Sequence, residues 1–253
     1  MTNTSKVQIE KLREEPYASI ICYPRGNDSE LQNRIVELHE HGVNEVEFAG
    51  AATAFNVPVL GKGFVGIVVI AYLNGQRAAL KIRRVDADRS SLYHEAQMLA
   101  KANAVQVGPR VIGVSKNFLL MQIIDGVALL NWLVTHKERA LVHRVLTDIL
   151  EQCWRLDNIG LDHGELSKAP KHLIVDKQGK PWIVDFETAS LTRKPANVTS
   201  VCQFLFTSNS AVARAAAEVL GGKNRDAIID ALRLYKNKRT LENFNRVTHA
   251  CLT

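Results

Sequence analysis

The second quarter of the chain alternates apolar runs with turn residues, a pattern typical of antiparallel strands. Residues 67–72 are rich in β-branched and aromatic side chains, and residues 78–82 form a second apolar run. Asn74 and Gly75 lie between the runs, and both tolerate the positive φ angles that a tight hairpin turn needs. We therefore predict a β-hairpin here, and further strands where apolar runs recur at residues 110–114 and 117–123.

Beyond Asp125 and Gly126 the apolar spacing changes from that of strands to the three-and-four spacing of helices. A second hairpin interrupts this part, because residues 172–175 and 181–184 are apolar runs that flank a turn-favouring segment. The sequence thus predicts an α+β fold with an antiparallel sheet first and mostly helices afterwards. Helices are predicted at residues 128–135, 141–156, 198–206, 210–219, 226–236 and 241–252.

Residues 1–56 have a pattern of their own. Short apolar runs at residues 18–23 and 44–48 predict two strands, and between them Ser29 and Gln32 have the spacing of a helix capping box. Gly42 follows the last apolar position of this helix and predicts its end. We expect a β-α-β-like extension that packs on the lobe after it, with packing on a partner protein as the alternative.

The composition is that of a folded globular protein. The chain has 253 residues, of which 46% are hydrophobic, enough to bury one core or two small ones. No apolar run approaches the roughly 20 residues that span a bilayer, and the first residues lack the apolar stretch of a signal peptide. We expect a cytoplasmic protein without a membrane partner. Widely spaced cysteines predict buried thiols instead of a zinc site or disulfides: Cys22, Cys153, Cys202 and Cys251.

The net charge of +6 allows an acidic partner, since Lys and Arg total 32 against 26 Asp and Glu. The basic residues lie in small groups, such as Arg83 with Arg84 and Arg193 with Lys194, with little aromatic interleaving. Such groups are typical of a solvated surface, so a nucleic-acid partner has weak support.

Gly61, Gly63 and Gly66 have the GxGxxG spacing and precede the first predicted hairpin. A dinucleotide-binding site needs a helix directly after such glycines, and a Walker loop needs Gly-Lys-Ser/Thr, so neither fits this context. A glycine hairpin instead lets backbone N–H groups approach phosphate oxygens, because no Cβ intervenes. A plain flexible hairpin is the alternative.

Lys81 lies in the middle of an apolar strand, where a buried lysine needs a partner of opposite charge. Glu95 comes three residues after Leu92 and shares the apolar face of the helix predicted at residues 91–102. We predict a Lys81–Glu95 ion pair, and a surface glutamate without this role is the alternative.

A polar loop with His163 and Glu165 leads into the second hairpin, and Asp185 leaves it. A hairpin holds its two ends at a fixed separation, so both carboxylates are presented together, as the binding of a metal-bound phosphate beside a hydroxyl requires. We expect His163 to shape the loop by hydrogen bonding. For Glu165, a loop carboxylate without a catalytic role is the alternative.

These features, in this order, resemble the protein-kinase fold, and most closely its RIO-type atypical branch and related predicted archaeal kinases. The resemblance covers roughly residues 57–206. It implies a bilobal fold with an N-lobe at residues 57–124, a C-lobe at residues 125–253, and the extension at residues 1–56 packed on the N-lobe.

The resemblance also implies ATP as the bound nucleotide, with Mg²⁺ or Mn²⁺. Lys81, oriented by Glu95, would hold the α- and β-phosphates. Asp185 would bind the metal ion, and Glu165 would orient or deprotonate the acceptor hydroxyl. The other nucleotide-binding positions that the resemblance implies are Gly61, Lys62, Gly63, Gly66, Val68, Met121, Gln122 and Ile124.

The sequence departs from the family pattern at three positions. Glu165 stands where the family has its catalytic Asp, and Glu187 stands where Asp-Phe-Gly has its Gly. His172 occupies the position of the second metal ligand, an Asn in the family, after two extra residues. An imidazole nitrogen is a softer ligand than a carboxamide oxygen and suits Mg²⁺ poorly.

The resulting expectation is a kinase that transfers the γ-phosphate of ATP to a hydroxyl acceptor, a protein Ser or Thr. Residues 188–199 are too short for a conventional activation segment and contain no Ala-Pro-Glu, so we expect no peptide-docking surface of the ordinary kinase type. One alternative is a nucleotide-binding pseudokinase that recruits a partner. Another is an RNA- or ribosome-associated factor.

Overall fold

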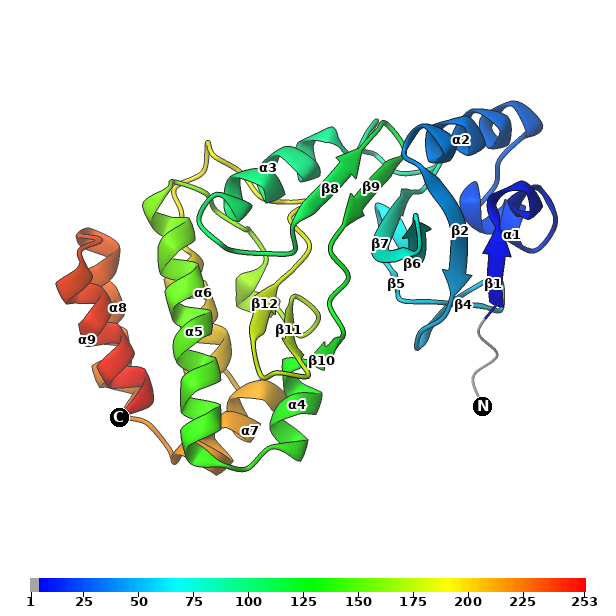
Figure 1. Ribbon diagram of the computed structural model, residues 1–253. Coiled ribbons are helices and arrows are strands. Elements are labelled where there is room, and N and C mark those ends of the chain that lie inside the picture. The colour runs from blue at the N-terminus through cyan, green and yellow to red at the C-terminus, as the bar shows by residue number, and fades with distance from the viewer. Residues whose placement is uncertain (1–4) are drawn as a thin grey trace. The chain divides into compact units, whose positions relative to one another are not determined.

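The computed structural model describes residues 5–253, and the chain forms two compact units. The first consists of the residues up to Gln97 together with Arg110–Ile123, and the second of Met98–Pro109 and Ile124–Thr253. In Figure 1 the strands of the first unit run from blue to green, and the helices of the second unit run from green to red.

An antiparallel sheet is the centre of the first unit. Within residues 5–253 it has seven strands in the order β1-β2-β6-β7-β9-β8, with β5 paired to β6. This sheet and the helical second unit confirm the predicted fold class. The strands are β1 (Ser5–Gln8), β2 (Val43–Phe48), β5 (Gly61–Lys62), β6 (Gly66–Leu73), β7 (Gln76–Arg83), β8 (Val111–Val114) and β9 (Phe118–Met121). A separate short pair consists of β3 (Ala52–Ala54) and β4 (Val57–Val59).

The first predicted hairpin is confirmed as β6 and β7. Asn74 and Gly75 have φ angles of 50° and 81°, as the turn requires. Side chains alternate along β7: Leu80 and Ile82 lie in the buried core of the unit, so Lys81 points to the opposite face, where it meets α3 (Tyr93–Asn103).

The prediction that Arg83 is solvated is wrong. Arg83 is 8% exposed, because the same alternation places it on the Lys81 face and Asn117 accepts hydrogen bonds from its guanidinium. Its neighbour Arg84 is partly exposed and pairs with Asp86 at 2.7 Å. The two arginines are adjacent in sequence, but Arg83 is buried and Arg84 is partly exposed.

The prediction of a strand at residues 18–23 is also wrong. The short helix α1 (Tyr17–Ile21) lies here, and the strand that pairs with β2 is β1, which is followed by the 3₁₀ helix η1 (Ile9–Arg13). An uninterrupted apolar run suits a buried helix as well as a strand, and Ile20 and Ile21 are fully buried.

The predicted helix after this run is confirmed as α2 (Asp28–Glu40), although its cap differs from the predicted one. The N-cap is Asn27 and not Ser29, because the Asn27 side chain accepts the Glu30 N–H at 2.9 Å. Gly42 follows the helix with a φ of 70°, as the predicted end requires.

Helices form most of the second unit, and each predicted helix is present with shifts of a few residues at its ends. The apolar face predicted for α5 is fully buried, from Val142 to Cys153. The helices are α4 (Leu129–Thr135), α5 (Arg139–Asn158), α6 (Asn197–Cys202), α7 (Ala211–Leu220), α8 (Arg225–Asn237) and α9 (Leu241–Leu252). Shorter turns are η2 (Leu166–Lys168) and the π-helical η3 (Gln203–Thr207).

The second predicted hairpin is confirmed as β11 (Leu173–Asp176) and β12 (Pro181–Ile183), which pair antiparallel beside β10 (Gly126–Ala128). The Asp176 carboxylate accepts two backbone N–H groups of the turn at 3.0 and 2.9 Å, and Gly179 has a φ of 78°. This turn fixes the ends of the two strands.

The four cysteines are free and buried, as predicted. Within residues 5–253, no helix combines the length and apolar character that crossing a membrane would require.

Candidate active site

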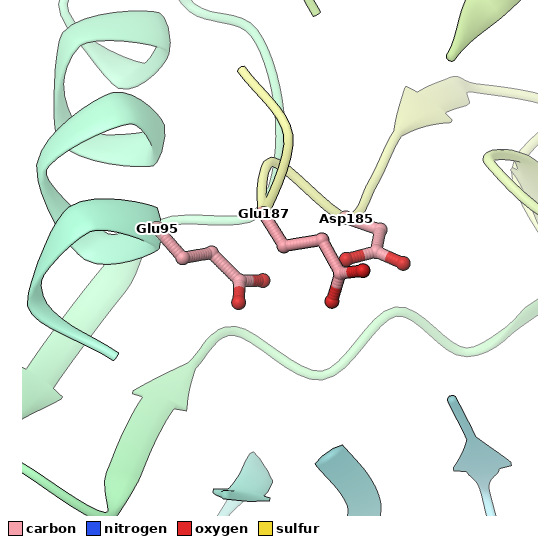
Figure 2. Close-up of side chains that lie close together, drawn as sticks. All are labelled: Glu95, Asp185 and Glu187. Atoms are coloured by element: carbon pink, nitrogen blue, oxygen red, sulfur yellow. The ribbon is translucent and has the colours of Figure 1, made fainter. Parts of the chain in front are cut away.

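Lys81 and Glu95 form a buried ion pair in the first unit. The Lys81 ammonium lies 2.9 Å from Glu95 Oε1 and 2.8 Å from Oε2, and the two side chains are 6% and 5% exposed. Glu95 projects from the first turn of α3 (Figure 2). Removing two charges from water costs free energy that a buried pair often fails to recover, so stability alone is a weak explanation for this pair.

The glycine hairpin adjoins Lys81 in the same sheet. Gly61 pairs with Val68, and Val68 lies opposite Lys81 on the neighbouring strand. The Gly63 N–H donates to the Gly66 carbonyl at 2.8 Å, which closes the turn. A Cβ at Gly66 would lie 2.8 Å from a main-chain carbonyl oxygen of β7 and 3.1 Å from Lys81 Cγ, so glycine allows this close approach.

Lys62, also implied for the nucleotide, is exposed on β5. Its ammonium lies 4.8 Å from the centre of the Tyr23 ring, a cation–π contact. The Arg84 guanidinium lies 5.1 Å from the same ring. Tyr23 therefore has two cations around it, next to the glycine turn.

The positions implied for the adenine lie at and after the end of β9. Met121 is half-buried opposite Ala79 of β7. The Gln122 N–H donates to the Arg110 carbonyl at 2.8 Å, so it is not a donor for a base. Ile124 belongs to the second unit and is half-buried there.

The second unit brings together Glu165, His172 and Asp185. His172 Nε2 lies 3.3 Å from Glu165 Oε2 and 3.8 Å from Asp185 Oδ2. Asp185 follows β12 on the same segment as Glu187 (Figure 2) and has a φ of 69°. This left-handed conformation costs a non-glycine residue roughly 1–3 kcal/mol and is frequent at functional sites.

His163 is fully buried behind this group. Its Nε2–H donates to the Val184 carbonyl at 3.1 Å, and its ring lies edge-on to Phe186 with 4.9 Å between centroids. Burial, and secondly the neighbouring His172, lower the pKa of His163 to about 4. His163 is therefore neutral at physiological pH and shapes the loop, as the sequence predicted.

A buried polar network that sequence reasoning missed holds the His163 loop. The Asn197 side chain accepts the His163 N–H at 2.8 Å and donates to the Leu161 carbonyl at 2.6 Å and to Asp157 Oδ1 at 2.8 Å. The Tyr235 hydroxyl donates to Asp157 Oδ2 at 2.9 Å. Burial raises the pKa of Asp157, and hydrogen bonds from its neighbours oppose that rise. The sequence pattern could have indicated this network. Asp157 lies four residues after Cys153 on the apolar face of α5, and a charge on an apolar face needs a partner, as Glu95 does on α3.

Gly164, between His163 and Glu165, was also missed. It has a φ of 92°, and a Cβ there would lie 2.6 Å from Arg193 Nη2. Arg193 in turn pairs with Asp162 at 2.9 Å. A Cβ at Gly164 would also lie 2.9 Å from Thr188 Oγ1 and 3.2 Å from the Thr188 carbonyl oxygen, so these contacts and the positive φ favour glycine at this position.

A hollow in the second unit lies away from these residues. Its volume is about 940 Å³, and it is lined by residues of β10, α4, the start of α5 and the β11–β12 turn. Neither Glu165, His172 nor Asp185 lines it. The hollow therefore does not include the group formed by Glu165, His172 and Asp185, in which polar side chains converge.

Comparison with known proteins gives an independent result for this region. The RIO domain family model matches residues 71–200, which contain Lys81, Glu95, Glu165, His172 and Asp185. A search of curated proteins found no match to this chain. The matched segment is more than half of the 253 residues, and it contains the ion pair and the strained aspartate described above. The chain therefore belongs to the RIO domain family of atypical, ATP-binding protein kinases.

Proposed function

We propose that this protein is an ATP-dependent kinase that transfers the γ-phosphate to a hydroxyl acceptor, a protein Ser or Thr. The observation that carries the proposal is the buried Lys81–Glu95 pair, with side chains 6% and 5% exposed. A buried ion pair is a costly way to fill a core, so its presence in the family-matched segment points to a role in binding.

In the first unit, Lys81 would hold the α- and β-phosphates, and Glu95 would fix the position of its ammonium. The backbone of Gly61, Lys62, Gly63 and Gly66 would cover the phosphates, since the turn has no side chain at its glycines to prevent close approach. Val68 and Met121 would contact the adenine, and the Gln122 carbonyl would accept from its amino group. The Ile124 N–H would be the matching donor.

In the second unit, Asp185 would bind the metal ion and Glu165 would orient or deprotonate the acceptor hydroxyl. The donor set fits a divalent cation, because two carboxylates lie within 3.8 Å of His172 Nε2. The ring nitrogen favours Mn²⁺ over Mg²⁺. When bound, the ion would neutralise charge on the phosphates. Glu165 is one methylene longer than the family Asp, and its 3.3 Å distance from His172 limits where its carboxylate can lie.

A nucleotide-binding pseudokinase is the second candidate. The observation that favours it is that Glu165, His172 and Glu187 all differ from the family pattern, and each of these positions belongs to the chemistry and not to the scaffold. In that case ATP would bind without turnover.

Transfer of label from γ-labelled ATP distinguishes the two. With Mn²⁺ or Mg²⁺, the wild-type protein should label itself or a generic protein acceptor, and Asp185→Ala should abolish the labelling. Asp230→Ala is the matched control, since Asp230 is exposed and pairs with Arg233 on the surface. ATP binding without any labelling would support the pseudokinase, and equal labelling by the wild type and Asp185→Ala would refute the proposal.

A further inference from the structure

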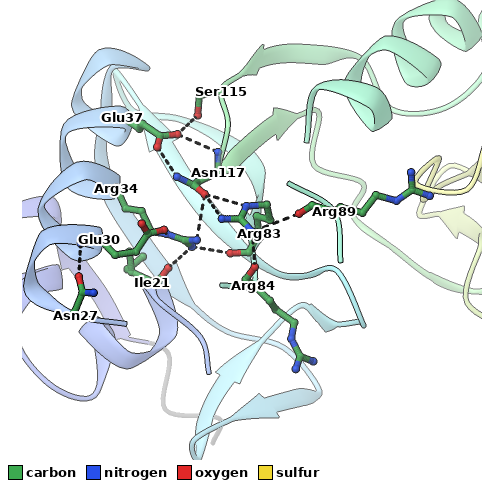
Figure 3. Close-up of polar contacts among 10 residues, drawn as sticks. All are labelled: Ile21, Asn27, Glu30, Arg34, Glu37, Arg83, Arg84, Arg89, Ser115 and Asn117. Atoms are coloured by element: carbon green, nitrogen blue, oxygen red, sulfur yellow. Dashed lines mark hydrogen bonds and ion pairs between the residues drawn. The ribbon is translucent and has the colours of Figure 1, made fainter. Parts of the chain in front are cut away.

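Arg34, on α2, is a fully buried arginine with an exposure of 0%. Its Nη1 donates to two main-chain carbonyls, those of Ile21 at 2.7 Å and Arg83 at 2.6 Å (Figure 3). Its Nε donates to Glu30 at 2.7 Å, and its Nη2 donates to Asn117 Oδ1 at 3.2 Å. One side chain of α2 thus holds the main chain at the end of β7 and Asn117, the residue directly before β9.

Asn117 connects Arg34 to a second buried arginine. Arg83 donates through Nε and Nη2 to the same Asn117 Oδ1 at 3.0 and 2.9 Å. On its other side, Asn117 donates from Nδ2 and from its main-chain N–H to the Glu37 carboxylate at 2.5 and 3.0 Å (Figure 3). Of the two carboxylates that α2 contributes, Glu30 pairs with Arg34 and Glu37 binds Asn117. Burial, and then the Arg34 charge, lower the pKa of Arg83.

These contacts converge on the end of the strand that carries Lys81. β7 ends at Arg83, two residues beyond Lys81. The Arg83 N–H donates to the Asn117 carbonyl at 2.8 Å, and the Arg84 N–H donates to the Val65 carbonyl of the glycine hairpin at 2.8 Å. The strand end is consequently the point at which α2, the β8–β9 turn and the glycine hairpin are joined.

A role beyond stability explains why arginine occupies this position. A buried charge network is often no more stable than apolar residues of the same volume. A guanidinium fork, by contrast, fixes the direction of the groups that it binds. The Lys81 side chain is held at one end by its strand and at the other by Glu95, so a shift of the strand strains this pair or moves the ammonium. A small displacement of that ammonium is costly for phosphate binding.

We propose that Arg34 is a positioning residue for Lys81, and that α2, which precedes the family-matched residues 71–200, is thereby an integral part of the nucleotide-binding unit. The role of Arg34 in nucleotide binding rests on the proposed function. We call the contacts of Arg34 with the Arg83 carbonyl and with Asn117 the clamp, and the clamp does not depend on the proposed function. Arg34 acts through the main chain of Arg83 and does not bind the nucleotide itself.

Arg34→Lys tests whether Arg34 positions Lys81, because the variant keeps the positive charge and loses the guanidinium fork. Lys81 would bind the phosphates, which adenosine lacks, so the ratio of the affinities for ATP and adenosine reports on Lys81. Both affinities are measured well below the melting temperature of the variant. The variant should lose roughly tenfold in affinity for ATP, as expected for one misplaced charge-assisted hydrogen bond, with adenosine affinity unchanged. In a Lys81→Met background, Arg34→Lys should leave the ratio unchanged.

Ile35→Val is the matched control, since Ile35 is 1% exposed on the same helix and its truncation lowers stability without touching the clamp. Equal ratios for Arg34→Lys and the wild type would overturn the proposal, as would an equal loss in Ile35→Val. If Arg34→Lys does not fold, Glu37→Gln replaces it, because this change weakens the hydrogen bonds that hold Asn117. The same ratio of affinities then tests the proposal.

Hydrogen exchange separates this inference from the proposed function. In the nucleotide-free protein, the amides of residues 80–84 should exchange faster in Glu37→Gln than in Ile35→Val. If the wild type shows no preference for ATP over adenosine, the proposed function fails, and faster exchange would still support the clamp. Unchanged exchange at residues 80–84 would refute the clamp whatever the nucleotide does.

Discussion

Truncation of Asn197 should destabilise the second unit more than any change on its surface. Asn197 is 1% exposed, and its side chain makes three hydrogen bonds, to the His163 N–H, the Leu161 carbonyl and the Asp157 carboxylate. Each bond to a main-chain group is worth about 1 kcal/mol, and a bond to a charged group about 2 kcal/mol. Asn197→Ala should therefore lower the free energy of unfolding by about 4 kcal/mol, because the partners stay buried and unpaired.

Urea denaturation monitored by far-ultraviolet circular dichroism measures this loss. Asn158→Ala is the control, since Asn158 is exposed at the end of α5 and its replacement should change the free energy by no more than about 0.5 kcal/mol. The pKa of Asp157 is raised in the fold, and losing a donor raises it further. The destabilisation should thus grow as pH rises through that pKa, because only the charged carboxylate needs the lost donor. Equal midpoints for the two variants would refute the network.

Three further predictions concern the loop that contains His163, Gly164 and His172. Gly164→Ala should lower the free energy of unfolding by about 2 kcal/mol, because Gly164 has a φ of 92° and a Cβ there would meet Arg193. Gly222→Ala is the control and should change it little, since the space around Gly222 is open. Thermal denaturation compares the two variants. The pKa of His163 is lowered to about 4, so the unfolded chain takes up a proton near pH 6.5 and the folded chain does so only near pH 4. The free energy of unfolding should therefore fall by up to about 3 kcal/mol between pH 6.5 and 4 and depend little on this group above pH 6.5, a slope that His163→Phe should remove in acid titrations. Labelling from ATP should be roughly tenfold greater with Mn²⁺ than with Mg²⁺, and His172→Asn should reverse that preference; a wild type that favours Mg²⁺ would contradict the assigned role of the ring nitrogen.

The parts of the fold that sequence predicted are those that local chemistry determines. The Asn74-Gly75 turn and the Asp176 turn specify their hairpins through backbone angles and short-range hydrogen bonds. The apolar face of α5 follows from spacing alone. The sequence does not specify the helix α1, because its short apolar run has no period that distinguishes a helix from a strand.

The candidate site was predictable where a charge interrupts an apolar pattern. Lys81 and Glu95 both do so, and the structure contains the ion pair that they predicted. Arg34 and Asn197 gave no such signal, because their partners lie up to 83 and 40 residues away in sequence and become neighbours only through the fold. The burial of Arg83 is not predictable from its neighbours in sequence, because its acceptor Asn117 lies 34 residues away.

Calorimetric titration with ATP in the presence of Mn²⁺, applied to the wild type and to Lys81→Met, measures whether Lys81 binds the phosphates. We expect the wild type to bind ATP, and we expect Lys81→Met, which keeps most of the length of the side chain and loses its charge, to bind ATP at least tenfold more weakly with unchanged affinity for adenosine. Equal affinities of the two proteins for ATP would contradict this expectation.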